Sequence, residues 1–180
     1  MAQTTKARGG EPVSLAAALE AGKKVAPDVT GFLMDDHRTV LGWFIWYDRA
    51  PDATARRKVA ARICAALRAH MAGEEEVFYP AARELVDNKD LVEHAFDEHA
   101  EARDLMERIE AASGDEEEQA DLMRKLNAAV AHHAREEETK LFPAVRSAGM
   151  DLYGVGAALA ARRVECLFEL PSPETAGRRN

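Results

Sequence analysis

The sequence has little cysteine, no long apolar run and no excess of basic residues, and each absence excludes a class of protein. The two cysteines, Cys64 and Cys166, lie far apart and fit no metal or redox spacing, so we expect reduced thiols in a cytoplasmic protein. No apolar run is long enough to span a membrane, and residues 1–12 lack the hydrophobic stretch of a signal peptide. With 24 Lys and Arg against 32 Asp and Glu, and no concentrated basic stripe, binding to nucleic-acid phosphates is disfavoured.

The composition that is present favours one helical domain. The chain has 180 residues, of which 47% are hydrophobic, enough for a sizeable core. Charged residues make up 31% and aromatic residues only 6%, which is typical of solvated amphipathic helices. No segment alternates apolar and polar residues as a half-buried strand does. We therefore predict an all-α fold.

Four long amphipathic segments dominate the chain. We expect Pro80 to kink or stop the second segment, and Pro143 lies at the end of the fourth. Four helices of this length joined by short connections are the pattern of an up-down-up-down four-helix bundle. The segments cover residues 29–47, 52–79, 90–112 and 115–142.

Shorter segments flank the predicted bundle. Residues 1–12 are polar and are expected to form a disordered arm, and residues 13–28 a short N-terminal helix. The bundle domain is assigned to residues 29–148. Residues 149–180 are expected to hold an extra C-terminal helix at 152–167, packed on the outside or the end of the bundle, followed by a frayed tail.

One template occurs twice in the sequence. His70 and Glu74 form a His-x-x-x-Glu pair, and His133 and Glu137 form the same pair 63 residues later (70 to 133). In both copies a proline follows ten residues after the histidine. A single pair of this kind is usually a solvated i, i+4 contact, but the duplication indicates that the two pairs have the same function.

A further histidine precedes each copy, on the helix before it. His37 lies 33 residues before His70, and His99 lies 34 residues before His133. Residues four apart on a helix share one face, about 5–6 Å apart, so the two copies would direct their side chains to the bundle axis. Four imidazoles and two carboxylates suit iron or another first-row metal, whereas the lack of thiolates disfavours a structural zinc site. The predicted ligands are His37, His70, Glu74, His99, His133 and Glu137.

The glutamates next to these pairs are expected to have no role in the site. At about 100° per residue these glutamates cannot all face the bundle axis, so we expect them to lie mostly on the solvated surface. They are Glu75, Glu76, Glu136 and Glu138.

The blocks that carry these residues resemble the hemerythrin family, in particular its bacterial HHE cation-binding branch. The matching blocks are LMDDHRTVL at 33–41, HMAGEEEVFYP at 70–80, EHAEARDL at 98–105 and HHAREEETKLFP at 132–143. The resemblance implies a four-helix bundle around two iron ions, bridged by an oxo or hydroxo group and two carboxylates. It further implies that the four predicted histidines are terminal nitrogen ligands and that Glu74 and Glu137 are the bridges.

The sequence departs from the oxygen-carrying members at one ligand. Those members have five histidine ligands, two of them four residues apart on the third helix. Here Ala95 and Arg103 occupy the positions four residues before and after His99. The candidates that could supply a further ligand are His94, His132, Tyr47 and Glu98.

The resemblance implies a protein that binds and turns over small oxidants, namely dioxygen, hydrogen peroxide or nitric oxide. With only six protein ligands, each iron would keep one open position, which favours peroxidase, catalase-like or nitric-oxide-reducing activity over oxygen carriage. One alternative is an oxygen or iron sensor or store without turnover, with the C-terminal helix as its readout. Another is an interaction protein whose bundle holds a different metal or none. No protein partner is apparent from the sequence.

Overall fold

The computed structural model describes residues 28–112 and 114–169, and this part of the chain is helical, without strands. The prediction of an all-α fold is thereby confirmed for these residues. None of the described helices has the length and apolarity needed to cross a membrane. The predicted arm at 1–12, the short N-terminal helix predicted at 13–28 except residue 28, and the tail at 171–180 lie outside the described residues.

The helices follow the predicted segments closely. The α-helical elements are α2 (Val29–Asp48), α3 (Ala53–Gly73), α4 (Tyr79–Leu85), α5 (Asp90–Ala111), α6 (Glu116–Glu136), α7 (Phe142–Ser147) and α8 (Leu152–Glu169). Two short π-helical segments interrupt them, η1 (Glu74–Phe78) between α3 and α4 and η2 (Glu137–Leu141) between α6 and α7.

Aspartates begin three of the long helices. Asp28, Asp52 and Asp115 each accept hydrogen bonds from backbone N–H groups in the first turn of α2, α3 and α6. These carboxylates satisfy donors that have no partner within the helix and complement the positive end of the helix dipole. The helix starts are therefore encoded locally in the sequence.

The two prolines do not stop their helices, although a stop was one of the two outcomes expected for Pro80. Pro80 and Pro143 each lie in the first turn of a further helix, α4 or α7. The preceding π-helical segments explain the difference. In η1 the N–H of residue 79 bonds to the carbonyl of Glu74, and in η2 the N–H of residue 142 bonds to the carbonyl of Glu137. This i→i+5 register inserts one extra residue, and the helical path then continues through the proline, whose fixed φ suits a first turn.

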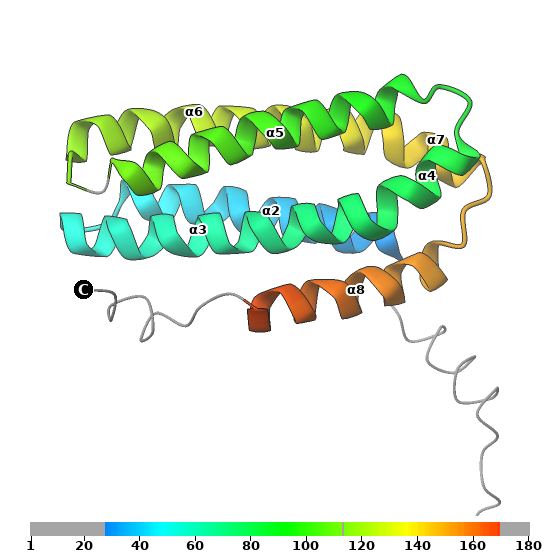
Figure 1. Cartoon of the computed structure of the whole chain (residues 1–180), viewed down its shortest axis with the longest axis horizontal. Coiled ribbons are helices and arrows are strands. Elements are labelled where there is room, and N and C mark those ends of the chain that lie inside the picture. The colour runs from blue at the N-terminus through cyan, green and yellow to red at the C-terminus, as the bar shows by residue number, and fades with distance from the viewer. Residues whose placement is uncertain (1–27, 113, 170–180) are drawn as a thin grey trace, which may run out of the picture.

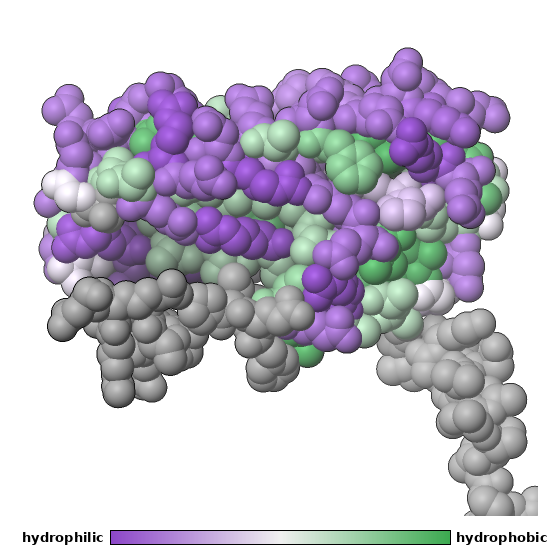
Figure 2. All heavy atoms as spheres, in the orientation of Figure 1, coloured by the Kyte–Doolittle hydropathy of each residue, from purple (hydrophilic) through white to green (hydrophobic). Residues whose placement is uncertain are grey.

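Four long helical segments lie side by side, with α5 beside α6 and α2 beside α3 (Figure 1). Contacts between α2 and α6 and between α3 and α5 join the two pairs. The last helix, α8, lies along α2 and α3 and also contacts η1. Figure 2 shows that polar side chains cover much of the visible face, while apolar side chains are concentrated in strips between the helices.

The buried apolar side chains form two separate clusters. The first cluster includes Val40, Phe44, Ile63, Leu67, Met106, Leu126 and Val130. The second cluster includes Leu33, Phe78, Tyr79, Ala95, Leu141, Phe142 and Leu159. Along α2, His37 falls between Leu33 of the second cluster and Val40 of the first. Along α5, His99 falls in the same way between the two clusters, so a polar layer divides the core.

Close packing holds α8 against α3. Leu159 is fully buried, and a Cβ atom added to Gly73 would lie only 3.2 Å from the Cγ atom of Leu159. The glycine therefore allows the two helices to approach where η1 begins. Ion pairs at the edge of this contact join Arg162 to Glu76 and Arg163 to Asp36.

We predict that Leu159→Ala lowers the free energy of unfolding by about 2–4 kcal/mol, because it removes apolar contacts and leaves a cavity against Gly73. Chemical denaturation would measure the change. The matched control is Val164→Ala on the same helix, where the side chain is exposed and the expected change is within about 0.5 kcal/mol. Equal effects of the two substitutions would contradict the described packing of α8.

Candidate metal centre

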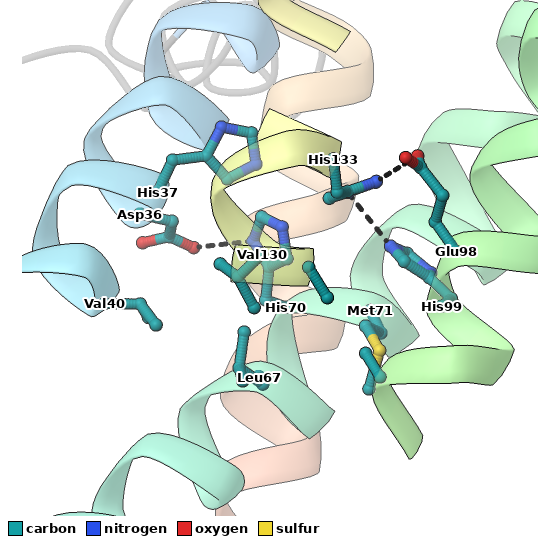
Figure 3. Close-up of a pocket in the computed structure, with 12 residues that line it drawn as sticks. Asp36, His37, Val40, Leu67, His70, Met71, Glu98, His99, Val130 and His133 are labelled. Atoms are coloured by element: carbon teal, nitrogen blue, oxygen red, sulfur yellow. Dashed lines mark hydrogen bonds and ion pairs between the residues drawn. The ribbon is translucent and has the colours of Figure 1, made fainter. Parts of the chain in front are cut away.

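The structure brings the six residues of the predicted site together in the polar layer. His37 comes from α2, His70 from α3, His99 from α5 and His133 from α6, and the two glutamates are the first residues of η1 and η2. All six side chains are buried. Figure 3 shows the four imidazole rings directed toward one another from their four helices. Ring centroids of His37 and His70 are 4.9 Å apart, and those of His99 and His133 are 4.6 Å apart.

Glu74 lies between two of the histidines. Its Oε2 atom is 3.0 Å from Nε2 of His70, one helical turn earlier, and 3.3 Å from Nε2 of His99 on α5. The same carboxylate therefore faces imidazoles from two helices. The His70 contact is the i, i+4 approach that the sequence spacing predicts.

Glu137 occupies the equivalent position in the second copy of the template. Its Oε2 atom is 3.6 Å from Nε2 of His133 and 3.5 Å from Nε2 of His37 on α2. Each glutamate thus faces the histidine of its own pair and the first histidine of the other copy of the template, His99 for Glu74 and His37 for Glu137. The duplication in the sequence appears in space as two matching halves of one cluster.

Several buried polar atoms of this cluster have no hydrogen-bond partner. Leaving such atoms unpaired in the interior costs about 1–3 kcal/mol each, and more for charged groups. Nitrogen and carboxylate oxygen atoms lie 3–3.6 Å apart here without hydrogen bonds between them. This is the spacing of atoms that bind the same cation. The donor set of this layer therefore fits a metal ion. The unpaired atoms are Nε2 of His37, Nδ1 and Nε2 of His70, Oε1 and Oε2 of Glu74, and Oε2 of Glu137.

Each imidazole has a carboxylate on its outward side. Such carboxylates fix the ring orientation and leave Nε2 free to face inward, which is the usual support of a metal-bound histidine. The outward pairs are Nδ1 of His37 with Glu138 at 3.1 Å, His70 with Asp36 at 3.5 Å, His99 with Glu75 at 2.7 Å, and His133 with Glu98 at 3.0 Å.

The expectation of no role for Glu75 and Glu138 was therefore wrong. Both residues follow a predicted bridging glutamate by one position, so they do not face the axis. They point sideways instead, toward the histidine of a neighbouring helix, which a helical-face argument within one helix does not detect. The expectation for the other two is supported by their placement, because Glu76 pairs with Arg162 and Glu136 with Lys140.

The protonation of the cluster reflects its unbalanced charge. Burial disfavours the charged form of His70, but Glu74 and Asp36 outweigh it and raise the pKa of His70 to about 10. Burial and the neighbouring His70 lower the pKa of His37 to about 3. Burial and the charge of Glu74 raise the pKa of Glu137 well above its ordinary value. Added positive charge, which a cation would supply, would favour the ionised form of both carboxylates.

Tyr79 is a further residue of this site that the sequence did not reveal. Its hydroxyl donates a 2.9 Å hydrogen bond to Oε1 of Glu137 and lies 3.1 Å from Nε2 of His99. Burial, together with Glu137, raises the pKa of Tyr79, so the phenol keeps its proton. It is five residues after Glu74, a spacing that points away from the site in an α-helix but not in the i→i+5 register of η1.

The four candidates for a further ligand lie elsewhere. His94 and His132 are 56% and 62% exposed at the surface. Tyr47 is buried in the first apolar cluster. Glu98 faces the outward Nδ1 atom of His133 rather than its inward Nε2 atom.

A small cavity of about 20 Å³ adjoins the four histidines. A space of this size holds about one water-sized molecule. Its walls combine the imidazoles with apolar side chains of the first cluster (Figure 3). The apolar lining residues are Val40, Leu67, Met71, Ala102, Ala129 and Val130.

Comparison with known proteins agrees with these observations. One relative is the protein described as "DNA nickase" from Nostoc sp. (strain PCC 7120 / SAG 25.82 / UTEX 2576), 31% identical over 112 residues. That match covers 62% of this chain, and the chain spans about a third (32%) of the length of that relative. No solved structure matches the chain. The profile of the hemerythrin HHE cation binding domain matches residues 28–145, which include every residue of the centre, and the chain therefore belongs to this family.

Proposed function

We propose that this protein is a non-heme diiron protein that binds and turns over small oxidants: dioxygen, hydrogen peroxide or nitric oxide. The proposal includes an up-down-up-down four-helix bundle as the scaffold. One observation carries it, namely the buried layer of four histidines and two glutamates, in which inward atoms of His37, His70, Glu74 and Glu137 lack hydrogen-bond partners. Iron bound by these groups would supply the electrons that reduce the oxidant.

The proposed ligands divide into two halves. His70 and His99 flank Glu74, and His37 and His133 flank Glu137. Each half would hold one iron, and the two carboxylates would bridge them as the family resemblance implies. Imidazole and carboxylate ligands together suit iron, manganese or cobalt better than they suit soft metals.

The protein around the ligands has three tasks. The outer carboxylates orient the imidazoles so that Nε2 faces inward. The small cavity of about 20 Å³ beside the histidines, with its largely apolar walls, would be the place where a small oxidant lies. Tyr79 holds a proton on its hydroxyl, hydrogen-bonded to Oε1 of Glu137, where a reduced oxidant needs protons.

Turnover is favoured over reversible oxygen carriage by the ligand count. The oxygen carriers of the family use five histidines, whereas this chain buries four and exposes His94 and His132. A position left open for substrate distinguishes a catalytic metal site from a closed one. The Tyr79 hydroxyl beside the cluster adds a proton donor, which carriage does not require.

A second candidate function is sensing or storage without turnover, and one contact favours it. Arg163 of α8 lies 3.0 Å from Oδ1 of Asp36, whose other oxygen faces Nδ1 of His70. A change at the centre could therefore reach α8.

The DNA-nicking activity named for the Nostoc relative is not extended to this chain, which spans about a third (32%) of that protein and has a net charge of −8.

We expect protein purified with iron supplied to contain two iron ions per chain, measured by elemental analysis. The double variant His70→Ala/His133→Ala should lose most of this iron, because each half loses a nitrogen ligand. Removing iron from the unaltered protein should lower the melting temperature by several degrees, since the metal binds only the folded state. The control is His94→Ala/His132→Ala, which removes the same residue type at the surface and should retain both irons.

We also expect a graded series among the glutamates. Glu74→Gln and Glu137→Gln should lose most iron, because an amide lacks the charge needed to bridge two cations. Glu75→Gln and Glu138→Gln should weaken iron binding by about 10–100-fold, as loss of a histidine-orienting carboxylate does. Iron affinity measured against a chelator would rank the variants. Glu76→Gln, on the same π-helical segment with its carboxylate at the surface, should match the unaltered protein.

The reaction itself can be tested by gas and peroxide measurements. The iron-loaded protein should consume hydrogen peroxide by disproportionation over many turnovers per chain, or nitric oxide over many turnovers when a chemical reductant is supplied to return the iron to its reduced state. Tyr79→Phe should slow this consumption while leaving the iron content unchanged. Exposure of the reduced protein to air, followed by vacuum, should return no dioxygen. Reversible release of dioxygen without peroxide or nitric-oxide consumption would identify a carrier instead, and neither behaviour would favour the sensor.

A further inference from the structure

A second group of metal-ligating side chains lies on the outer surface of α5 and α6. His94 and Glu98 are one turn apart on α5, and His132 faces them from α6. One nitrogen or oxygen atom from each of the three residues lies within 4.8 Å of the corresponding atoms of the other two. Both imidazoles are more than half exposed, so an ion in solution can reach them.

The contacts within this group are not hydrogen bonds. Nε2 of His94 is 3.7 Å from Oε1 of Glu98, and Nε2 of His132 is 3.5 Å from the same oxygen. This Oε1 atom is inaccessible to solvent and has no hydrogen-bond partner in the described part of the chain. A buried carboxylate oxygen beside two imidazole nitrogens that do not bond to it is an unsatisfied acceptor.

The spacing suits a shared cation. Tetrahedral ligands with metal–ligand distances of about 2.0–2.2 Å are roughly 3.3–3.6 Å apart. Two histidines and one glutamate, with a remaining position for water, are a ligand set that zinc uses in proteins. Glu136 lines the small cavity beside His94 and Glu98.

We propose that His94, Glu98 and His132 form an outer site for a divalent transition-metal ion of the Zn²⁺ class, separate from the buried centre. The family ligand set does not use His94 or His132, and the proposed diiron chemistry does not require them. The outer site nevertheless shares one residue with the support of the centre. Oε1 of Glu98 faces the outer histidines, while its Oε2 accepts the hydrogen bond from Nδ1 of His133.

The test uses the full chain after iron loading and Zn²⁺ as the probe. Equilibrium dialysis measures bound Zn²⁺, and elemental analysis measures iron in the same samples. The unaltered protein should bind one more Zn²⁺ per chain than His94→Ala/His132→Ala, at equal iron content. Zn²⁺ should also raise the melting temperature of the unaltered protein but not of this variant. The matched control, Asp97→Ala/Arg135→Ala, changes exposed neighbours on the same two helices and should bind Zn²⁺ as the unaltered protein does.

Equal Zn²⁺ binding by the unaltered protein and the histidine variant would overturn the outer site, as would loss of iron in proportion to the Zn²⁺ bound. The comparison also works without iron. If the buried centre takes up no iron at all, the proposed function fails, but a difference of one Zn²⁺ between the two proteins still supports the outer site. A Zn²⁺ anomalous scattering peak between the three side chains would locate the ion directly.

Discussion

The burial of two carboxyl groups among four imidazoles is the constraint on which the rest of this structure depends. Glu74 and Glu137 lie fully inside the protein, and each faces two imidazole nitrogens without forming a hydrogen bond to them at its inward oxygen. Such a layer is costly unless a cation occupies it. The polar layer divides the core in two, and the apolar clusters on either side hold the four helices at the spacing that the layer requires.

The two π-helical segments show how the backbone serves this layer. Each begins at a glutamate of the centre, and each shifts the following residues by one position relative to an α-helix. The shift brings the residue five positions later over the site. In one half this is Tyr79, whose hydroxyl binds Glu137, and in the other it is Phe142, whose ring stacks on His37 with centroids 6.2 Å apart. The two halves share a backbone device but differ in chemistry.

The outer carboxylates connect the centre to the surface in different ways. Asp36 and Glu75 pair outward with arginines, Arg163 of α8 and Arg103 of α5. Glu98 instead faces two surface histidines, which can bind a cation themselves. A guanidinium neutralises a carboxylate permanently, because arginine does not lose its proton in proteins, whereas imidazole nitrogens leave the position open to a metal. The outward partner of each carboxylate therefore decides whether that carboxylate is purely structural or can also bind a metal.

The sequence by itself determined the helical class, the positions of the long helices and the six residues that gather in the polar layer. Amphipathic periodicity, the aspartate caps and the duplicated His-x-x-x-Glu template are local signals, readable within one helix. The roles of Glu75, Glu138 and Tyr79 were decided only by the tertiary structure. The two glutamates act on histidines of other helices. Tyr79 reaches the site because the π-helical register changes which residues share a face. Neither effect is encoded in α-helical spacing.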